Sequence, residues 1–567
     1  MIRLFVPALV GLMLCLAMSV RADTLPEACI DDVQSVACQQ ALLAEGVAPY
    51  EEYHKRTRTD EIVTPLSSEV FGDNVSLYNG STQFSVVDID VPGNSTLPVQ
   101  LRRTFKVETR KGAPLGFFGV WDLDIPHLSG VFDAEFAWTI GQSGQPTPRC
   151  SSAFYPAGRP NLAANEIWSG TSMHLPGDGD RELLWRDQPH PVPADGHTYP
   201  WITRDDYRLR CVPSVTDTHG NSYPGEGFLA IDREGTTYTF DVATHRYHSS
   251  IIKSKSLYQR VRVFLLASRI EDRHGNWVRY HYADGRLTQI TSNDGRVINL
   301  QYEWDPSHGG YHRIISASAH GRTWTYGYGL QTMGAPPRRL LTTVNLPDGA
   351  SWGYQYTGPL IPVYETDPDL PLSCNPPLTN GNGEDFTLTA THPAGVRGRF
   401  VFHYRRHYRS GVPYNTCVPP QYQVTMPNTA DVYSLISKTL DSVGVPTQTW
   451  SFDYAETPYP RAEFVTPWCQ SCPQFKDVTV TAPDASRQRY RYGVVWNHND
   501  GRLLATTTLT PGNSVLRDEA HTYVAENEIG SMPFPGTMGT LSASDDPAAT
   551  RLRPVKQTVI TQQGVSF

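Results

Sequence analysis

The chain has 567 residues and a formal net charge of −9, with 48 Lys and Arg set against 57 Asp and Glu. This length is enough for roughly two to four domains with sizeable cores, and charges scattered along the chain argue against a nucleic-acid partner. Aromatic residues make up 11% of the chain, and Gly and Pro number 45 each, a composition typical of strands joined by tight turns.

The N-terminus has the features of a secretory signal peptide over residues 1–22. The apolar stretch from Leu4 to Val20 follows Arg3 and leads into Ala22, a small residue at the cleavage position. A membrane anchor is the alternative, but the stretch is barely long enough to span a bilayer. We therefore expect a secreted, periplasmic or cell-surface protein with no membrane span after cleavage.

Eight cysteines remain after residue 22, and an even number in an exported chain favours disulfides. Their connectivity cannot be derived from spacing, although Cys29 with Cys38 and Cys469 with Cys472 are close enough in the chain to be candidate pairs. A redox or zinc half-site is the alternative for Cys469 and Cys472, but no second pair or flanking βαβ pattern accompanies them.

Only one substantial helix is predicted, between Asp31 and Ala44, where apolar residues fall near helical spacing and Gly46 follows as a stop. From about Ser67 onward the sequence alternates apolar and polar residues between turn signals. We expect β-structure from there to about Tyr523, followed by a loop between Pro533 and Thr550.

The clearest pattern is a repeat between Leu265 and Tyr356. Four glycines are each followed by a Tyr seven residues later and by apolar residues three and five positions later; chance predicts roughly 0.35 such cases. These positions share one face of a strand, and an apolar residue five or six positions before each Gly marks a preceding strand. The repeat pairs are Gly275 with Tyr282, Gly295 with Tyr302, Gly321 with Tyr328, and Gly349 with Tyr356.

Each repeat unit is predicted to be a β-hairpin, with Gly at a turn that needs a positive φ and Tyr packing on the neighbouring unit. One hairpin cannot bury its apolar face, whereas stacked hairpins can. The fold class is therefore mainly β, with stacked antiparallel hairpins in a curved or spiralling sheet. We divide the chain into a signal peptide (1–22), a helical or linker segment (23–66), a β-rich region (67–260), clear repeats (261–360), degenerate repeats (361–530), and a loop with the start of another repeat (531–567).

The segments Tyr282–Ile290 and Asn293–Tyr302 resemble the RHS/YD-repeat family, and the segment from Asp73 to Phe84 resembles the N-terminal region of exported bacterial members. The resemblance implies a β-sheet shell that encloses a toxic polypeptide or serves in cell contact. It also implies a downstream RHS or toxin polypeptide, or a cell-surface glycan, as partner. The family's core-associated cleavage motif is not found; Asp305–Gly310 is similar to it but lies inside the repeats. A truncated or split member with an unpaired sheet edge is expected.

Candidate chemistry is sparse, and we assign no catalytic, cofactor or metal site. Asp178 and Asp180 have a spacing that calcium ligands use, but the remaining ligand positions do not follow, so an ordinary acidic turn is favoured. The pairs His245 with His248 and His403 with His407 suit a metal on a helix but lie in strand-like sequence.

No nucleophile elbow, phosphate loop, dinucleotide fingerprint or zinc-protease motif occurs, so the chain is predicted not to be an enzyme. A glycosidase with two carboxylates is the enzymatic alternative. A second alternative is a carbohydrate-binding module in which tryptophans stack on sugar rings. For these tryptophans, however, packing in the core is the favoured role. They are Trp121, Trp168, Trp185, Trp201, Trp277, Trp324 and Trp352.

Overall fold

The structure is a computed structural model. It describes residues 63–65, 70–107, 116–139, 147–153, 162, 167–168, 170–186, 192–217, 223–253, 256–306, 311–331, 338–360, 385–412, 429–456, 472–496, 498–525, 528 and 555–566. The predicted helix between Asp31 and Ala44 and the predicted loop from Pro533 to Thr550 lie outside these residues.

A five-stranded antiparallel sheet, which we call the inner sheet, opens the described chain. Strand β4 alternates strictly: every second side chain, from Leu101 to Val107, is buried, as expected for a strand with one face in a core. The strands are β1 (Val63–Pro65), β2 (Asp73–Ser76), β3 (Thr82–Asp90), β4 (Gln100–Val107) and β5 (Asp122–Leu123).

The next strands pair in a circuit that returns on itself, which we call the strand ring. Long strand β15 pairs with β14 on one side and with β6 on the other. From β6 the pairing passes through β7, β8 and β9, β10, β11 and β13 back to β14; β12 pairs with β14 in parallel. Its strands are β6 (His127–Asp133), β7 (Thr171–Leu175), β8 (Gly179–Glu182), β9 (Leu184–Trp185), β10 (Trp201–Ile202), β11 (Arg208–Val212), β12 (Thr216–Asp217), β13 (Gly227–Ile231), β14 (Thr237–Lys253) and β15 (Ser256–Glu271).

From the end of β15 the chain continues as consecutive antiparallel hairpins in one curved sheet, which we call the long sheet. Its strands are β16 (Trp277–Ala283), β17 (Arg286–Ser292), β18 (Val297–Asp305), β19 (Tyr311–Ala319), β20 (Arg322–Gln331), β21 (Arg338–Asn345), β22 (Ser351–Thr357), β23 (Phe386–Thr391), β24 (Arg397–Tyr408), β25 (Thr429–Ser442), β26 (Val445–Tyr454), β27 (Phe475–Thr481), β28 (Arg487–Gly493), β29 (Leu503–Leu509), β30 (Val515–Tyr523), β31 (Val555–Gln562) and β32 (Val565–Ser566).

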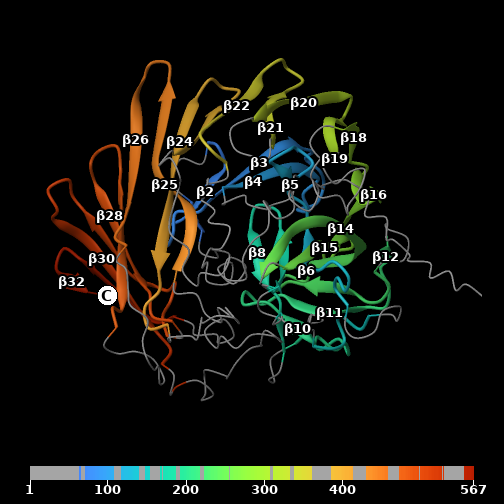
Figure 1. Cartoon of the computed structure of the whole chain (residues 1–567), viewed down its shortest axis with the longest axis horizontal. Helices are drawn as coiled ribbons and strands as arrows, with labels where there is room; N and C mark the ends of the chain where they lie inside the picture. Colours follow the sequence, from blue (N-terminus) through green and yellow to red (C-terminus); the bar gives the residue numbers. More distant parts are fainter. Residues whose placement is uncertain are drawn as a thin grey trace, which may run out of the picture.

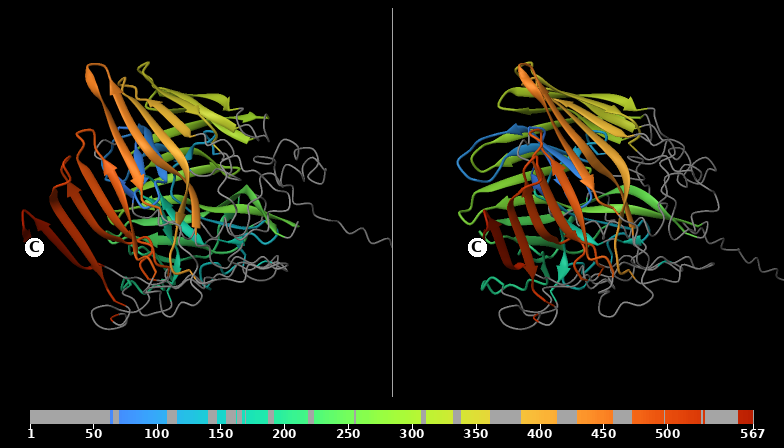
Figure 2. Two further views of the ribbon diagram at one scale, coloured as in Figure 1. Left: turned by 60° about the vertical axis from the view of Figure 1, so that its left-hand side comes forward. Right: turned by 90° about the vertical axis from the view of Figure 1, so that its left-hand side faces the viewer.

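The inner sheet lies on the concave side of the long sheet, so the curve encloses part of the chain itself (Figure 1, blue strands within the yellow and orange strands; Figure 2). One apolar core joins the two. Phe84 meets Phe400 edge to face at 4.9 Å between ring centroids, and Trp121 lies 5.0 Å from Tyr354. A separate core, including Trp138, Trp201 and Phe228, fills the strand ring.

The predicted fold class is confirmed: the described chain is almost entirely β, with stacked antiparallel hairpins in a curved sheet. The sequence did not predict the strand ring or the burial of the inner sheet against the repeats. Strand β15 also crosses the boundary expected at residue 260, because its first part pairs with β6 and its last part with the first repeat strand.

Candidate functional site

The repeat glycines lie at hairpin turns with positive φ, at +81° for Gly275, +86° for Gly295, +72° for Gly321 and +88° for Gly349. At three of them the turn residues make the same two backbone hydrogen bonds; at Gly275, for example, Asp272 accepts from Gly275 and donates to Asn276. Gly321 instead follows His320, also at positive φ, in a two-residue turn. With this shorter turn the residue opposite Trp324 is Ala317, four positions before Gly321, whereas Ile315, six positions before it, is only half-buried.

Each repeat tyrosine donates a hydrogen bond to a backbone carbonyl of the preceding strand. The pairing of β15 with β16 ends at Arg269 and Arg279, and three residues later the Tyr282 hydroxyl reaches the Ala267 carbonyl at 2.8 Å. The hydroxyl thus donates to a carbonyl oxygen beyond the end of the backbone pairing between the two strands. A buried carbonyl without a donor there would cost free energy. The other three bonds are Tyr302 to Leu287, Tyr328 to Ile314, and Tyr356 to Leu341.

Buried charged side chains fasten the inner sheet to the long sheet. Arg103 of β4 donates to both carboxylate oxygens of Asp88 at 3.0 Å and to the Tyr354 hydroxyl at 2.7 Å, and its guanidinium lies 4.6 Å from the centroid of Trp121. Burial would lower the pKa of Arg103, but Asp88 and the tyrosines raise it above its ordinary value. A cation held between aromatic faces and a carboxylate stays charged without solvent.

A second buried pair joins Lys438 of β25 to Asp73 of β2, with both side chains fully inaccessible. Sequence analysis missed these cations, although a signal was present. Arg103 falls between Leu101 and Phe105 on the buried face of β4, and Lys438 lies two residues before the buried Leu440 on the same face of β25. A charged residue in phase with apolar ones predicts a buried partner.

A third network surrounds His407 of β24. Its Nδ1 lies 2.5 Å from the Glu456 carboxylate, its Nε2 lies 2.8 Å from the Ser434 hydroxyl, and Lys476 contacts Glu456 at 2.6 Å. Burial and Lys476 lower the pKa of His407. Burial would raise the pKa of Glu456, but Lys476 and His407 lower it to about 2, so the carboxylate stays ionised.

Ser434, His407 and Glu456 thus have the order of contacts found in a hydrolase triad. However, the Ser434 hydroxyl donates to the carbonyl oxygen of Asn79 in the inner sheet at 2.6 Å, and Ser434 is fully buried. A nucleophile must approach a carbonyl carbon of a substrate, whereas this hydroxyl is engaged with the protein's own backbone. The network therefore fastens the inner sheet to β24 and β25.

A fourth network joins the inner sheet to the strand ring through His174 of β7. Its two ring nitrogens contact Asp124 and Asp180, each at 2.6 Å, and Lys106 of β4 reaches Asp180 at 2.6 Å. Burial would lower the pKa of His174, but the two carboxylates raise it to about 9. Since both nitrogens face carboxylates, the ring is held as an imidazolium.

The candidate metal motifs are engaged in other contacts: His245 packs against the ring of Tyr223, and His248 contacts the Ser249 hydroxyl. Asp178 pairs with Arg181, and Asp180 pairs with His174 and Lys106. His403 contacts Asp385 at 2.7 Å, separately from the network of His407. Across the described ranges, no group of three His, Cys, Asp or Glu side chains is placed to hold a metal ion.

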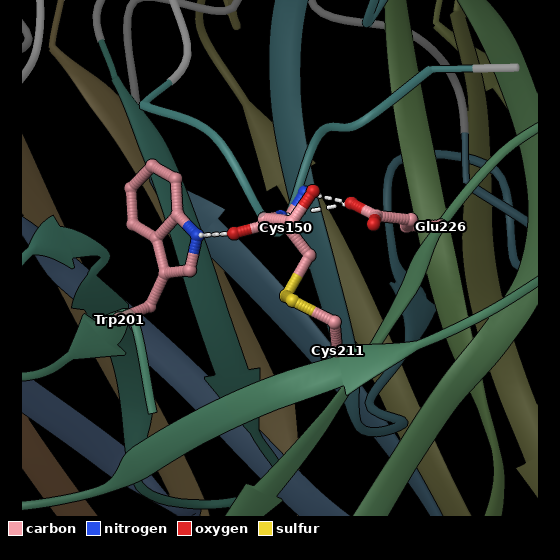
Figure 3. Close-up of a disulfide and its surroundings, with 5 residues drawn as sticks. Cys150, Trp201, Cys211 and Glu226 are labelled. Atoms are coloured by element: carbon pink, nitrogen blue, oxygen red, sulfur yellow. Dashed lines mark hydrogen bonds between the residues drawn. A yellow bond between two sulfur atoms is a disulfide. The ribbon is translucent and has the colours of Figure 1, made fainter. Parts of the chain in front are cut away.

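A disulfide joins Cys150 to Cys211 of β11, a pair that spacing did not single out. The Cys150 carbonyl accepts from Trp201 at 2.7 Å and its N–H donates to Glu226 at 3.0 Å, so three elements meet there (Figure 3). Cys472 is also disulfide-bonded, to a cysteine outside the described residues. The candidates Cys29, Cys38 and Cys469 lie outside them as well.

Most of the tryptophans considered as sugar platforms are core residues. Trp121, Trp168, Trp201 and Trp352 are at most 7% exposed, so these four have no face to offer a ligand. The remaining three, Trp185, Trp277 and Trp324, are half-buried.

The last strands of the long sheet differ from its preceding strands, because β30, β31 and β32 contain no buried side chain. Four apolar side chains there are 48–59% exposed: Val515, Leu516, Val555 and Val565. Within the described chain, β31 pairs fully with β30 but with β32 at only two residue pairs, leaving an open edge along 555–560. Such an edge presents unpaired N–H and C=O groups.

No helix in the described part of the chain is both long and apolar enough to cross a membrane.

Comparison with known proteins gives weak likenesses. No family model and no curated protein match the chain. A crystal structure of a porin-like protein from Bacteroides uniformis covers 65% of this chain and 100% of its own, at 11% identity and a TM-score of 0.17. The N-terminal domain of the effector protein SpvB from Salmonella typhimurium covers 66% of this chain and 95% of its own, at 14% identity and a TM-score of 0.16. Scores this low carry no argument about fold or function.

Proposed function

We propose that the chain is a non-catalytic, exported β-repeat scaffold that forms part of a shell of the RHS/YD-repeat type. The observation that carries the proposal is the contrast within the long sheet: its first hairpins close over the inner sheet, and its last strands end in an uncovered sheet with an open edge. Four polar networks of the core support the same role, because those of Arg103, Lys438, His407 and His174 each join the inner sheet to its surroundings.

The open edge of β31 is the proposed attachment site for a further strand of an RHS or toxin polypeptide. Its only charged side chain, Lys556, is engaged by Glu528, so no free charge on this strand repels another strand, a protection that natural edges often use. Pairing there would also cover the exposed Val555 and Val565.

Hydrogen exchange tests this proposal. The protein recovered from its native source should show protected amides at 555–560, together with a co-purifying polypeptide identified by mass spectrometry and a mature N-terminus at Asp23. The isolated chain should exchange the same amides rapidly. Equal protection of the edge in both preparations, with no co-purifying chain, would contradict the proposal.

A carbohydrate-binding role is the second candidate, and only the half-buried tryptophans favour it. Trp277 lies between two guanidinium groups, with Arg279 4.7 Å and Arg269 5.6 Å from its ring centroid, a partly exposed arrangement that a sugar ring could extend. A glycan array in which the protein and its Trp277→Ala variant bind equally would remove this candidate.

A further inference from the structure

Two histidines stack where the strand ring is joined together. His127 of β6 is the cross-strand partner of His174 in β7 and also pairs with Leu266 of β15. The two imidazole rings are 4.8 Å apart and nearly parallel, with Phe264 against the edge of His127. Any change in charge at this stack therefore acts on both pairings of β6.

The surroundings give the two rings different charge states, because they favour a protonated His174 and a neutral His127. His174 lies between the carboxylates of Asp124 and Asp180, as described above. His127 instead donates from Nδ1 to the Ile125 carbonyl at 2.8 Å, and Asp180 acts on it only through its charge. Burial lowers the pKa of His127 well below its ordinary value, and His174 and Arg262 add to this effect.

The charged groups around the stack come from every neighbouring element. Arg262 of β15 donates to Ser129 of β6; Lys106 of β4 holds Asp180 of β8; and Arg102 lies 3.9 Å from Asp124. Asp124 and Asp180 have lowered pKa values, so both carboxylates remain ionised beside the two histidines.

We propose that the His127–His174 stack is a two-sided pH lock that keeps the strand ring closed while the pair carries one proton. A second proton would place two cations face to face beside Arg262. Loss of the first would leave two carboxylates facing a neutral ring. The ring should loosen at β6 and β7 on either side of a window near pH 6.5.

Hydrogen exchange on the full chain at pH 5.0, 6.5 and 8.5 tests the lock. After correction for intrinsic rates, amides of β6 and β7 should exchange slowest at pH 6.5 and about tenfold faster at each extreme, as linkage to an opened state with ordinary histidine pKa values requires. Strands β20 and β21, which lack this stack, provide the internal reference and should not change.

Two variants test the acid and the alkaline increase in exchange rate separately. His127→Asn keeps a donor for the Ile125 carbonyl and should remove only the acid side; His174→Gln should remove only the alkaline side. His320→Asn, at an exposed turn, is the control and should change neither. A wild-type profile that changes in one direction only, or one that both variants leave intact, overturns the proposal. If a variant fails to fold, the pH dependence of exchange in wild-type β6 and β7, compared with β20 and β21, still tests the proposal.

Discussion

The two ends of the long sheet place different side chains on the same inner face. Tyr490 of β28 belongs to the shared core, and its cross-strand row continues through Thr506 and Glu519 to Ile560. On β30 this face carries Arg517, Glu519 and His521, because directly opposed residues share a face. Apolar character ends where the inner sheet ends.

The hairpin geometry nevertheless persists to the last strands. The Tyr523 hydroxyl donates to the Leu503 carbonyl at 2.9 Å, as Tyr282 does to Ala267. The repeat motif therefore specifies how strands follow one another, whereas contact with the inner sheet determines which faces are apolar. Substitutions in the covered and in the uncovered part of the long sheet should separate the contribution of the repeat motif from that of contact with the inner sheet.

The largest effect is expected from Arg103→Met, which leaves Asp88 buried without its cation. Removing one partner of a buried pair costs about 3–5 kcal/mol of the free energy of unfolding, measurable as a lower urea midpoint. Arg517→Met, in the uncovered region, should cost less than about 0.5 kcal/mol. Equal losses in the two variants would show that the inner sheet is not a stability determinant.

Glu456→Gln should come next, at about 3 kcal/mol near pH 7, because Lys476 loses its buried counter-ion. The pKa of Glu456 is lowered to about 2, so its carboxylate contributes stability above about pH 4.5 that is lost as pH falls through 2. Thermal melts from pH 7 to 2 should therefore fall less steeply in the variant. Parallel curves would exclude Glu456 as a source of the acid dependence.

Tyrosine-to-phenylalanine substitutions compare the covered and uncovered hairpins directly. The Tyr356 hydroxyl donates to Leu341 and accepts from Trp121, so Tyr356→Phe leaves two buried groups unpaired and should cost about 1–3 kcal/mol. Tyr523→Phe removes one partly exposed bond and should cost about 0.5–1 kcal/mol. Urea midpoints of both variants provide the measurement. A larger loss for Tyr523→Phe than for Tyr356→Phe would contradict the distinction between covered and uncovered hairpins.

The smallest effect is expected at the turns. A Cβ added to Gly295 meets no atom within 4 Å, so Gly295→Ala should cost only the backbone term, about 1 kcal/mol. Gly295→Asn should cost less, because Asn tolerates positive φ. If both variants destabilise the protein equally, side-chain contacts rather than the positive φ explain the preference for Gly at this position.

The fold could be predicted from the sequence where information is local. Alternation, the turn at Gly275 and the spacing to Tyr282 all depend on residues within a few positions, and they identified the hairpins.

The fastening networks could not be predicted, because they join partners that are distant along the chain, for example 49 residues apart for His407 and Glu456 and 365 for Asp73 and Lys438. Nothing in the sequence near Asp73 indicates Lys438, and the Cys150–Cys211 disulfide has no spacing signature. What could have been found is the existence of buried charge: Arg103 and Lys438 stand in phase with apolar residues.

The position of the inner sheet also constrains how the molecule is made. Tyr78 bonds Asp500 across 422 residues and Asp73 bonds Lys438 across 365, so strands that emerge first from the ribosome find their partners last. Non-local pairing of this kind slows folding and prolongs exposure of apolar surface. The apolar faces of β2 to β5 therefore stay uncovered until β28 has been synthesised.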